Sequence, residues 1–396
     1  MIPYALDWLN LLARWFHFVA GISWIGASFY FVWLDNSLTA PSQETDREDG
    51  VFGELWSVHG GGFYHNQKYL TGPKREPLTE HLHWFKWEAY STWLSGVALM
   101  AIVYWAGAQS FLIDPSVMAL SVPTAIAVSI ASLIVGWFVY DGLCRMLERR
   151  PKLLAGSVFA FLVLASWMLF HVFSGRAAFI HVGAIIGTIM VANVFFVIIP
   201  GQRRMLAQIR AGRDPDPRPG VLGKMRSVHN TYLTLPVLFI MISNHYPMTY
   251  SGAYGWLVLV ALGVAGVLVR YFFLLTHKAK MLWVLPTAAA AIVVATAIAL
   301  APRVASSAAG TPVNYDRVAP IFAERCAVCH SARPTYPGFP VAPAGVLLDT
   351  RDHVVTNVAR IEAQAVQARA MPLGNLTHMT DAERTLVGAW IAQGAK

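Results

Sequence analysis

The chain has 396 residues, of which 56% are apolar and only 13% are charged, and it carries 14 tryptophans. This composition excludes an ordinary soluble protein and indicates one embedded in a lipid bilayer. The formal net charge of +8 arises from basic residues gathered in a few loops, so it does not require a nucleic acid as partner.

Long apolar stretches divide the first three quarters of the chain. Each has roughly twenty residues or more, enough to cross a hydrocarbon core of about 30 Å. The sequence therefore predicts an all-α membrane protein with eight transmembrane helices in residues 1–301, the first of them an uncleaved span. The spans are expected near residues 6–34, 87–108, 117–140, 153–173, 177–199, 229–248, 253–275 and 281–301.

Lysine and arginine are unevenly divided among the connections between these spans. The loops after the first, third, fifth and seventh spans hold five, four, seven and two of them, whereas the other loops hold only Arg176. By the positive-inside rule, the even-numbered loops and both termini face the periplasm of a bacterial inner membrane.

Two spans carry histidines that lead to a first site prediction. His17 lies about ten residues into the first span, where an unpartnered imidazole is costly. Weak sequence echoes between spans one and five, and between two and six, indicate two parallel four-helix halves. We therefore expect His17 and His181 to ligate one b-type haem, with His171 as the substitute for His181 and with Arg14 and Arg176 at the propionates. The simpler alternative is that these histidines only bond neighbouring helices.

The most polar connection is WSVHGGGFYHNQKYLTGP, residues 56–73. Its three glycines permit close backbone approach, and the donors, acceptors and one cation that follow suit a flat anionic heterocycle. We expect the inner ends of spans two and six to complete this site, although each residue alone is more typical of an interfacial anchor. The candidate catalytic residues are His65, Lys68, His83, Glu88 and His229, and the candidate binding residues are Gly61, Gly62, Tyr64, Asn66, Gln67, Asn230 and Thr231.

Residues 313–396 follow a small-residue linker at 302–312 and contain ERCAVCHSARP, a C-x-x-C-H motif. This is the attachment signature of a c-type haem, in which Cys326 and Cys329 form thioethers and His330 ligates the iron. No second cysteine pair accompanies the motif, which disfavours a zinc site.

The second axial ligand of that haem is expected from a methionine. Met371, followed by a proline in a loop, is preferred to Met379, which abuts a helix start. That start reads as a capping box formed by Thr380 and Glu383. The segment therefore resembles a periplasmic class I cytochrome c domain.

The stretches GGGFYHNQKYL, HWFKWEAYSTWLSG and SVHNTYLTLPVLFIMISNHYP, joined to such a domain, resemble the bacterial membrane-bound urate oxidases, or urate hydroxylases, over essentially the whole chain. The resemblance implies oxidation of urate to 5-hydroxyisourate in purine breakdown. It also implies that electrons pass through haem to the fused cytochrome c and on to the respiratory chain, where a terminal oxidase is the expected acceptor.

Three other readings remain open. The first is a quinol-oxidising electron-transfer subunit. The second is a porphyrinogen oxidase, because RWFHFVAGISWIGASFY resembles the first helix of the membrane protoporphyrinogen oxidases. The third is a non-enzymatic membrane anchor for the cytochrome, which the polar cytoplasmic loop disfavours.

Overall fold

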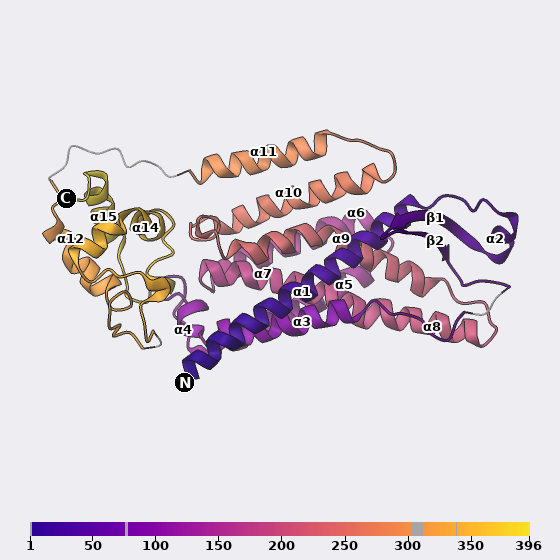
Figure 1. Ribbon diagram of the computed structural model, residues 1–396, viewed down its shortest axis with the longest axis horizontal. Helices are drawn as coiled ribbons and strands as arrows, with labels where there is room; N and C mark the ends of the chain where they lie inside the picture. Colours follow the sequence, from indigo (N-terminus) through magenta and orange to yellow (C-terminus); the bar gives the residue numbers. More distant parts are fainter. Residues whose placement is uncertain (1, 76–77, 302–311, 338) are drawn as a thin grey trace.

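The computed structural model describes residues 2–75, 78–301, 312–337 and 339–396, so almost all of the predicted linker lies outside the described residues. The protein is mostly helical, and its long helices run side by side in one elongated bundle (Figure 1). These helices are α1 (Ile2–Ser37), α3 (Trp87–Leu99), α5 (Val122–Met146), α6 (Pro151–Phe170), α7 (Gly175–Ala192), α9 (Arg218–Ser243), α10 (Gly255–Thr276) and α11 (Val284–Ala299). Each overlaps one of the eight predicted spans.

Five of the helical segments are long and apolar enough to cross a membrane, and α11 is apolar but shorter. Two predicted spans depart from a simple apolar helix. The helix α3 continues as a π-helix, η1 (Met100–Trp105), and the first half of α9 carries several cations. The helix α7 also continues, through the π-helix η2 (Asn193–Ile198) into α8 (Ile199–Arg210).

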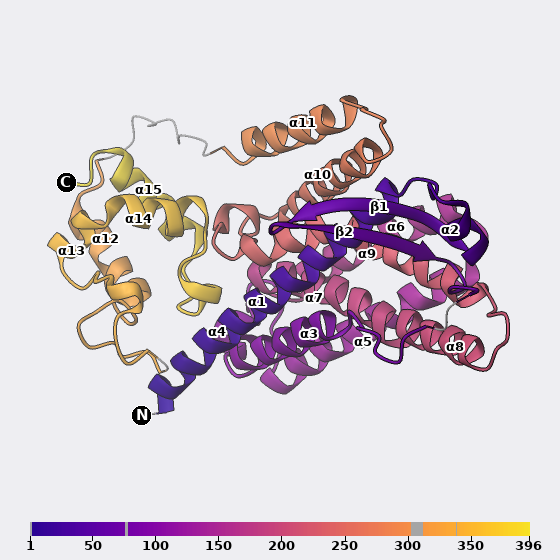
Figure 2. The ribbon, with the colours of Figure 1, turned by 45° about the vertical axis from the view of Figure 1, so that its right-hand side comes forward.

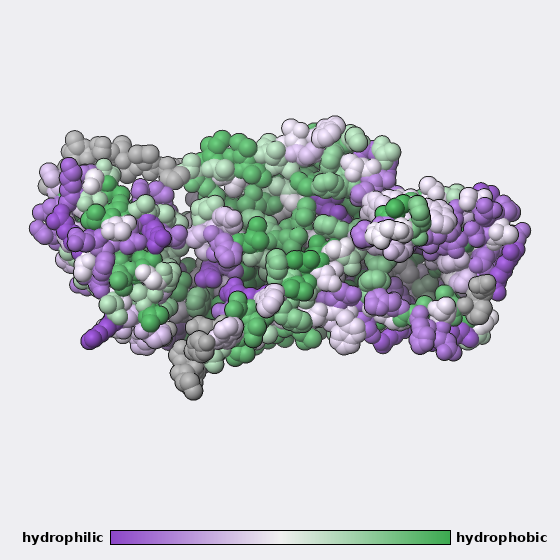
Figure 3. Space-filling view, viewed as in Figure 1, coloured by the Kyte–Doolittle hydropathy of each residue, from purple (hydrophilic) through white to green (hydrophobic). Residues whose placement is uncertain are grey.

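The outer surface of the bundle is apolar around its middle. Figure 3 shows this as a green zone between purple ends. Large side chains that a soluble protein would bury are exposed there, such as Trp15 at 66% and Phe138 at 67%. An apolar zone flanked by polar ends is the surface expected of a protein that meets lipid.

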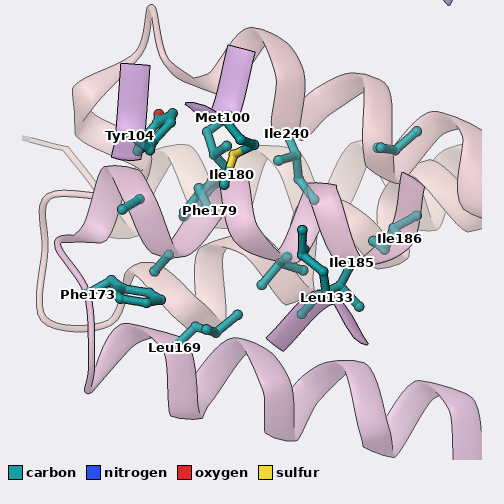
Figure 4. Packing of buried hydrophobic residues seen from close by; sticks show 14 of the residues in the cluster. Met100, Tyr104, Leu133, Leu169, Phe173, Phe179, Ile180, Ile185, Ile186 and Ile240 are labelled. Atoms are coloured by element: carbon teal, nitrogen blue, oxygen red, sulfur yellow. The ribbon is translucent and has the colours of Figure 1, made fainter. Parts of the chain in front are cut away.

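The centre of the bundle is α7, which is buried along most of its length, whereas the other candidate spans expose most of theirs. Its residues Phe179, Ile180, Ile185 and Ile186 pack against neighbours from the surrounding helices (Figure 4). Small residues allow the close approach: a Cβ added at Gly183 would lie 2.6 Å from the side chain of Ile240 on α9.

One polar element, formed by residues 51–69, is a β-hairpin, whereas the sequence predicted only a polar, glycine-rich connection. The strands β1 (Val51–His59) and β2 (Gly62–Tyr69) pair antiparallel, preceded by α2 (Glu44–Asp49). Gly60 and Gly61 form the two-residue turn with φ of +58° and +83°. Positive φ at both positions is the signature of a type I′ turn, which strongly favours glycine. The glycine run is thus explained by the turn.

The C-terminal domain is a small helical unit. Its elements are α12 (Tyr315–Ile321), η4 (Phe322–Cys326), η5 (Pro343–Gly345), α13 (Arg351–Thr356), α14 (Val358–Ile361), η6 (Glu362–Gln367), η7 (Leu373–Asn375) and α15 (Asp381–Ala392). They enclose a core around the fully buried Trp390. The predicted capping box is confirmed, because Thr380 and Glu383 exchange both expected hydrogen bonds at the start of α15.

The hairpin and the C-terminal domain lie at opposite ends of the bundle, and α1 begins at the C-terminal domain's end (Figures 1 and 2). The domain contacts α4 (Ala108–Phe111) and the loop after it: a Cβ added at Gly374 would lie 3.2 Å from the carbonyl oxygens of Ser110 and Ile113. We call the two ends the hairpin end and the outer end.

Candidate functional site

The hairpin end of the bundle contains a buried polar network built around His229 of α9. The Nδ1 atom of His229 lies 2.8 Å from the hydroxyl of Tyr140 on α5, which also accepts a hydrogen bond from Asn193 at 3.0 Å. In the tautomer whose Nδ1–H donates to Tyr140, His229 Nε2 carries a lone pair. That atom has no partner within the described part of the chain.

Asn193 extends the network to a second predicted residue. Its amide also donates to Asn230 Oδ1 at 2.9 Å, and the Asn230 amide donates to the Met190 carbonyl oxygen. Asn193 is fully buried at the start of η2, and single π-helical turns often occur at functional sites. Thr231 is buried too, but its hydroxyl donates to Ser227 within α9, so it does not join this network.

A buried ion pair between Arg226 and Asp141 is bonded to this network. Arg226 is 4% exposed and donates to Asp141 at 2.6 Å and to Asn193 at 3.2 Å. Asp141 also accepts from Arg145 at 2.6 Å, so one carboxylate is paired with two cations. The Cys144 sulfur, on the same helix as Tyr140, lies 3.9 Å from His229 Nδ1. Tyr140, Asp141, Asn193 and Arg226 were not predicted, although polar residues next to apolar runs were the available signal.

The hairpin separates the polar residues that the sequence grouped together. Side chains alternate between the two faces of a strand, so His65 and Gln67 lie on one face, and Tyr64, Asn66 and Lys68 lie on the other. His65 stacks on Trp56 with ring centroids 4.3 Å apart, and its Nε2 lies 2.8 Å from Glu54. The structure therefore does not bring His65 and Lys68 to one point.

The face that carries Lys68 is tied to the helical bundle. Lys68 pairs with Asp35 at the end of α1, and Asp35 also lies 3.1 Å from Lys224 of α9. Partial burial, reinforced by the charge of Lys224, lowers the pKa of Lys68. On the opposite face, the Ser42 hydrogen bonds and then the bond with His65 hold the pKa of Glu54 below its ordinary value.

The remaining predicted residues of this end occupy separate positions. His83 is exposed and meets Phe85 edge-on at 4.6 Å, and Phe85 in turn contacts Phe31 of α1. Glu88 lies in the first turn of α3, where its Oε2 is buried without a hydrogen-bond partner in the described residues. Gly61 lies in the hairpin turn and Gly62 opens β2.

A cavity of about 480 Å³ opens at the same end between the segment before α3 and α8. Arg203 lies over the Trp84 ring there, at 6.0 Å from the ring centroid. Its lining contains none of the predicted site residues; it consists of Glu80, Leu82, Trp84, Arg203, Leu206, Ala207 and Arg210.

The histidines predicted to hold a b-type haem lie toward the outer end. His17 Nδ1 is 3.0 Å from both the Thr92 carbonyl oxygen and Ser95 Oγ on α3. His181 is fully buried, with Nε2 2.6 Å from Ser129 and Nδ1 2.7 Å from the Ala177 carbonyl oxygen. Iron ligation by His181 would require Nε2 to give up its bond with Ser129. The haem b site stays a prediction.

Arg14 and Arg176, which were predicted to meet the haem propionates, lie near each other. Arg14 and Arg176 lie close enough for their charges to interact, and both lie near Tyr104. Arg176 also donates to Asn244 at 3.2 Å. The substitute ligand His171 is exposed, and its Nδ1 lies 2.7 Å from the Trp167 carbonyl oxygen. The structure thus brings together the two predicted arginines.

The C-x-x-C-H motif in the C-terminal domain has the donor set that a covalent haem needs. Cys326 and Cys329 are free thiols in one turn, in which Cys329 N–H donates to the Cys326 carbonyl oxygen at 3.1 Å. His330 Nδ1 lies 3.0 Å from the Val346 carbonyl oxygen, which orients the ring and leaves Nε2 for iron, as is usual for metal-binding histidines. These residues fit a c-type haem.

The two candidate methionines differ in their surroundings. Met379 is 4% exposed in the domain core, whereas Met371 is half-buried at the edge of the same cluster that Cys326 borders. The Met371 backbone is held at both ends, because its N–H donates to Gln364 and its carbonyl oxygen accepts from Arg384. Met379 is therefore a core residue, and Met371 stays the predicted ligand.

Comparison with known proteins gives one result. A family model described as urate oxidase N-terminal matches residues 3–301. No curated protein and no solved structure matches the chain. The matched segment contains every long helix and the hairpin, and the C-terminal domain lies outside it.

Proposed function

The chain belongs to the urate oxidase N-terminal family, and from this premise we propose that it is a membrane-bound, cytochrome-linked urate hydroxylase. In the proposed reaction, urate and water give 5-hydroxyisourate, two protons and two electrons. The oxygen added at C5 comes from water, and the electrons pass to the fused cytochrome c domain and then to the respiratory chain.

The observation that carries this proposal is the network at His229. A neutral imidazole whose Nδ1 is held by Tyr140 and whose Nε2 is free is suited to accept a proton. The Asn193 amide donates to the Tyr140 hydroxyl and to Asn230, and these bonds fix the hydroxyl relative to α9. We propose that His229 takes a proton from urate or from the attacking water, and that the unpaired oxygen of Glu88 assists.

The proposed topology follows from the apolar middle and the polar ends of the bundle. Eight helices cross a bacterial inner membrane, with the hairpin end in the cytoplasm and both termini in the periplasm. Tyr64 and Asn66 lie on the same face of the hairpin as Lys68, which pairs with α1, and this face would help admit the anionic substrate. The basic cavity at Arg203 and Arg210 lies at the same end and would attract an anion from the cytoplasm.

The C-terminal domain is proposed to hold one c-type haem. Cys326 and Cys329 would bind it covalently, and His330 and Met371 would be its axial ligands. Such a group accepts one electron at a time, and methionine ligation raises its reduction potential. The chain contributes the fixed imidazole of His330 and the backbone-anchored loop of Met371, while the capped helix α15 closes the domain.

The test uses purified full-length protein with its cytochrome oxidised. Urate is expected to reduce the cytochrome spectrum, whereas quinol and porphyrinogen are not. His229→Ala should lower urate turnover by about 100-fold or more, as expected for loss of a general base. His245→Ala is the matched control, because His245 is exposed near the outer end. Reduction by quinol without reduction by urate would overturn the proposal.

A further inference from the structure

A second buried cation lies at the hairpin end, and nothing in the described structure neutralises it. Arg270 of α10 is 5% exposed, and its Nε and Nη2 atoms are buried without hydrogen-bond partners among the described residues. None of the ion pairs in that part of the chain includes it. A buried charge without a partner is costly, so the unpaired edge of Arg270 points to a ligand that completes it.

The orientation of the guanidinium is set by packing and not by polar contacts. Its central carbon lies 4.1 Å from the centroid of the Phe29 ring on α1. The two unsatisfied groups, Nε–H and Nη2–H, form one edge of the guanidinium. This edge is the fork that binds two adjacent acceptor atoms of a planar anion.

The opposite wall is formed by α9. A Cβ added at Gly266 would come within 3.3 Å of Pro236, so the two helices approach closely at this level. Since α9 and α10 are antiparallel, moving one turn toward the hairpin end on each helix brings Arg270 next to Tyr232. Tyr232 also contacts Tyr271, with ring centroids 6.2 Å apart.

The helix α9 also offers a hydrogen-bond acceptor, the Tyr232 carbonyl oxygen, and it carries the proposed base, His229. Pro236 inside α9 has no N–H, so the Tyr232 carbonyl oxygen lacks its usual helical donor. His229 precedes Tyr232 by three positions, so the two residues are neighbours on the surface of α9, about 4.5 Å apart along the helix axis. The buried edge of Arg270 and the free carbonyl thus lie where α9 meets α10, and His229 lies about one helical turn away along α9.

We propose that Arg270 binds the anionic edge of a planar heterocyclic monoanion and presents it to His229. Resting on the proposed function, this ligand is urate: adjacent oxygen and ring nitrogen atoms accept from Nε–H and Nη2–H, and an N–H of the ring donates to the Tyr232 carbonyl oxygen. Arg270 is then the residue that selects the charged purine, and Phe29 and Tyr232 border its flat faces.

The test measures urate binding separately from turnover. Full-length protein is reduced beforehand so that bound urate is not oxidised, and urate affinity is measured by equilibrium dialysis. Arg270→Gln removes the charge and the fork, whereas Arg270→Lys keeps the charge and removes the fork. Both are expected to bind urate at least about tenfold more weakly. Arg218→Gln, at an exposed arginine of the same end, is expected to bind as the wild type does.

The outcomes separate this inference from the proposed function. Failure of the wild type to bind urate overturns both, whereas wild-type affinity in Arg270→Lys overturns only the role of Arg270. Loss of co-purifying phosphatidylglycerol from the variants, with urate affinity unchanged, would identify a lipid phosphate as the occupant and also overturn the proposal. Covalent haem content verifies folding, and Arg270→Lys decides the matter if Arg270→Gln does not fold.

Discussion

Asp141 is the residue on which the charge balance of the buried network depends. It neutralises Arg226, whose side chain is 5% exposed, and it also pairs with Arg145, whose side chain is 76% exposed. The two pairs share one carboxylate but differ in solvent access. Their contributions to stability should therefore differ strongly, because water screens the exposed pair and not the buried one.

We predict that Asp141→Asn destabilises the protein by about 3–5 kcal/mol, since it leaves Arg226 buried without a counter-charge. Arg145→Gln, which breaks only the exposed pair, should cost less than about 1 kcal/mol. Thermal unfolding of both variants in detergent, followed by circular dichroism, measures the difference. Equal midpoints for the two variants would contradict the buried pairing.

At the two methionines, the structure supports opposite expectations. We predict that Met371→Ala removes the charge-transfer band of a methionine-ligated haem from the oxidised spectrum, while Met379→Ala keeps the band. Met379→Ala should instead destabilise the domain by about 2–5 kcal/mol, as expected for a buried methionine. Optical spectra and thermal melts of both variants decide this. Loss of the band in Met379→Ala alone would reverse the ligand assignment.

Among the elements, the β-hairpin contains a carboxylate, Glu54, whose protonation should weaken it. The Ser42 N–H and hydroxyl, together with His65, hold the pKa of Glu54 below its ordinary value of 4.5. A carboxylate with a depressed pKa stabilises the fold above its unfolded pKa, and this contribution is lost as pH falls through the lower folded value. The hairpin should therefore loosen below about pH 4.5.

We predict that amide protection in residues 51–69 falls on acidification through this range in the wild type. Glu54→Gln should already show lower protection at pH 7 and little further change. Hydrogen exchange, corrected for the intrinsic rate at each pH, provides the measurement. Glu48→Gln, which alters an exposed pair with Arg75, is the control and should follow the wild type.

The helices were predictable from the sequence to a greater extent than the hairpin. Apolar length alone located the long helices, and the Thr380 and Glu383 pattern located the start of α15. The sequence predicts a binding loop here because the segment is rich in polar residues, although the glycine pair at its turn is the signal of a hairpin. Alternation along its strands then separated His65 from Lys68, which adjacency in sequence had grouped.

The polar network around His229 could not be predicted from the sequence, because its members are distant along the chain. Tyr140 and His229 are 89 residues apart, and only the packing of α5 against α7 and of α7 against α9 brings them together. His229 and Asn230 were predicted from their place at a helix end, but their partners were not. Arg270 and its unpaired edge could be recognised only once burial was known.

On the scale of the whole molecule, the two proposed sites lie at opposite ends of the bundle. The C-terminal domain with the C-x-x-C-H motif is at the outer end (Figure 1). The His229 network involves Tyr140 near the end of α5 and Asn193 just after α7, toward the hairpin end. A hydrocarbon core is about 30 Å thick, which is too far for one efficient electron transfer. We therefore expect a redox group between the ends if urate is oxidised at one end and the cytochrome is reduced at the other.

We predict that this group is a b-type haem held through His17. His17 Nε2 has no hydrogen-bond partner in the described residues, since only Nδ1 contacts α3. Arg14 and Arg176 lie together toward the same end, where propionates would meet them. Acid–acetone extraction removes haem b but leaves thioether-bound haem, so one extractable haem per covalent haem is expected. His17→Ala should lose the extractable haem and keep the covalent one, and His245→Ala should keep both. A haem-free extract from fully loaded wild type would exclude haem b as the relay and would leave the distance between the two ends without a carrier.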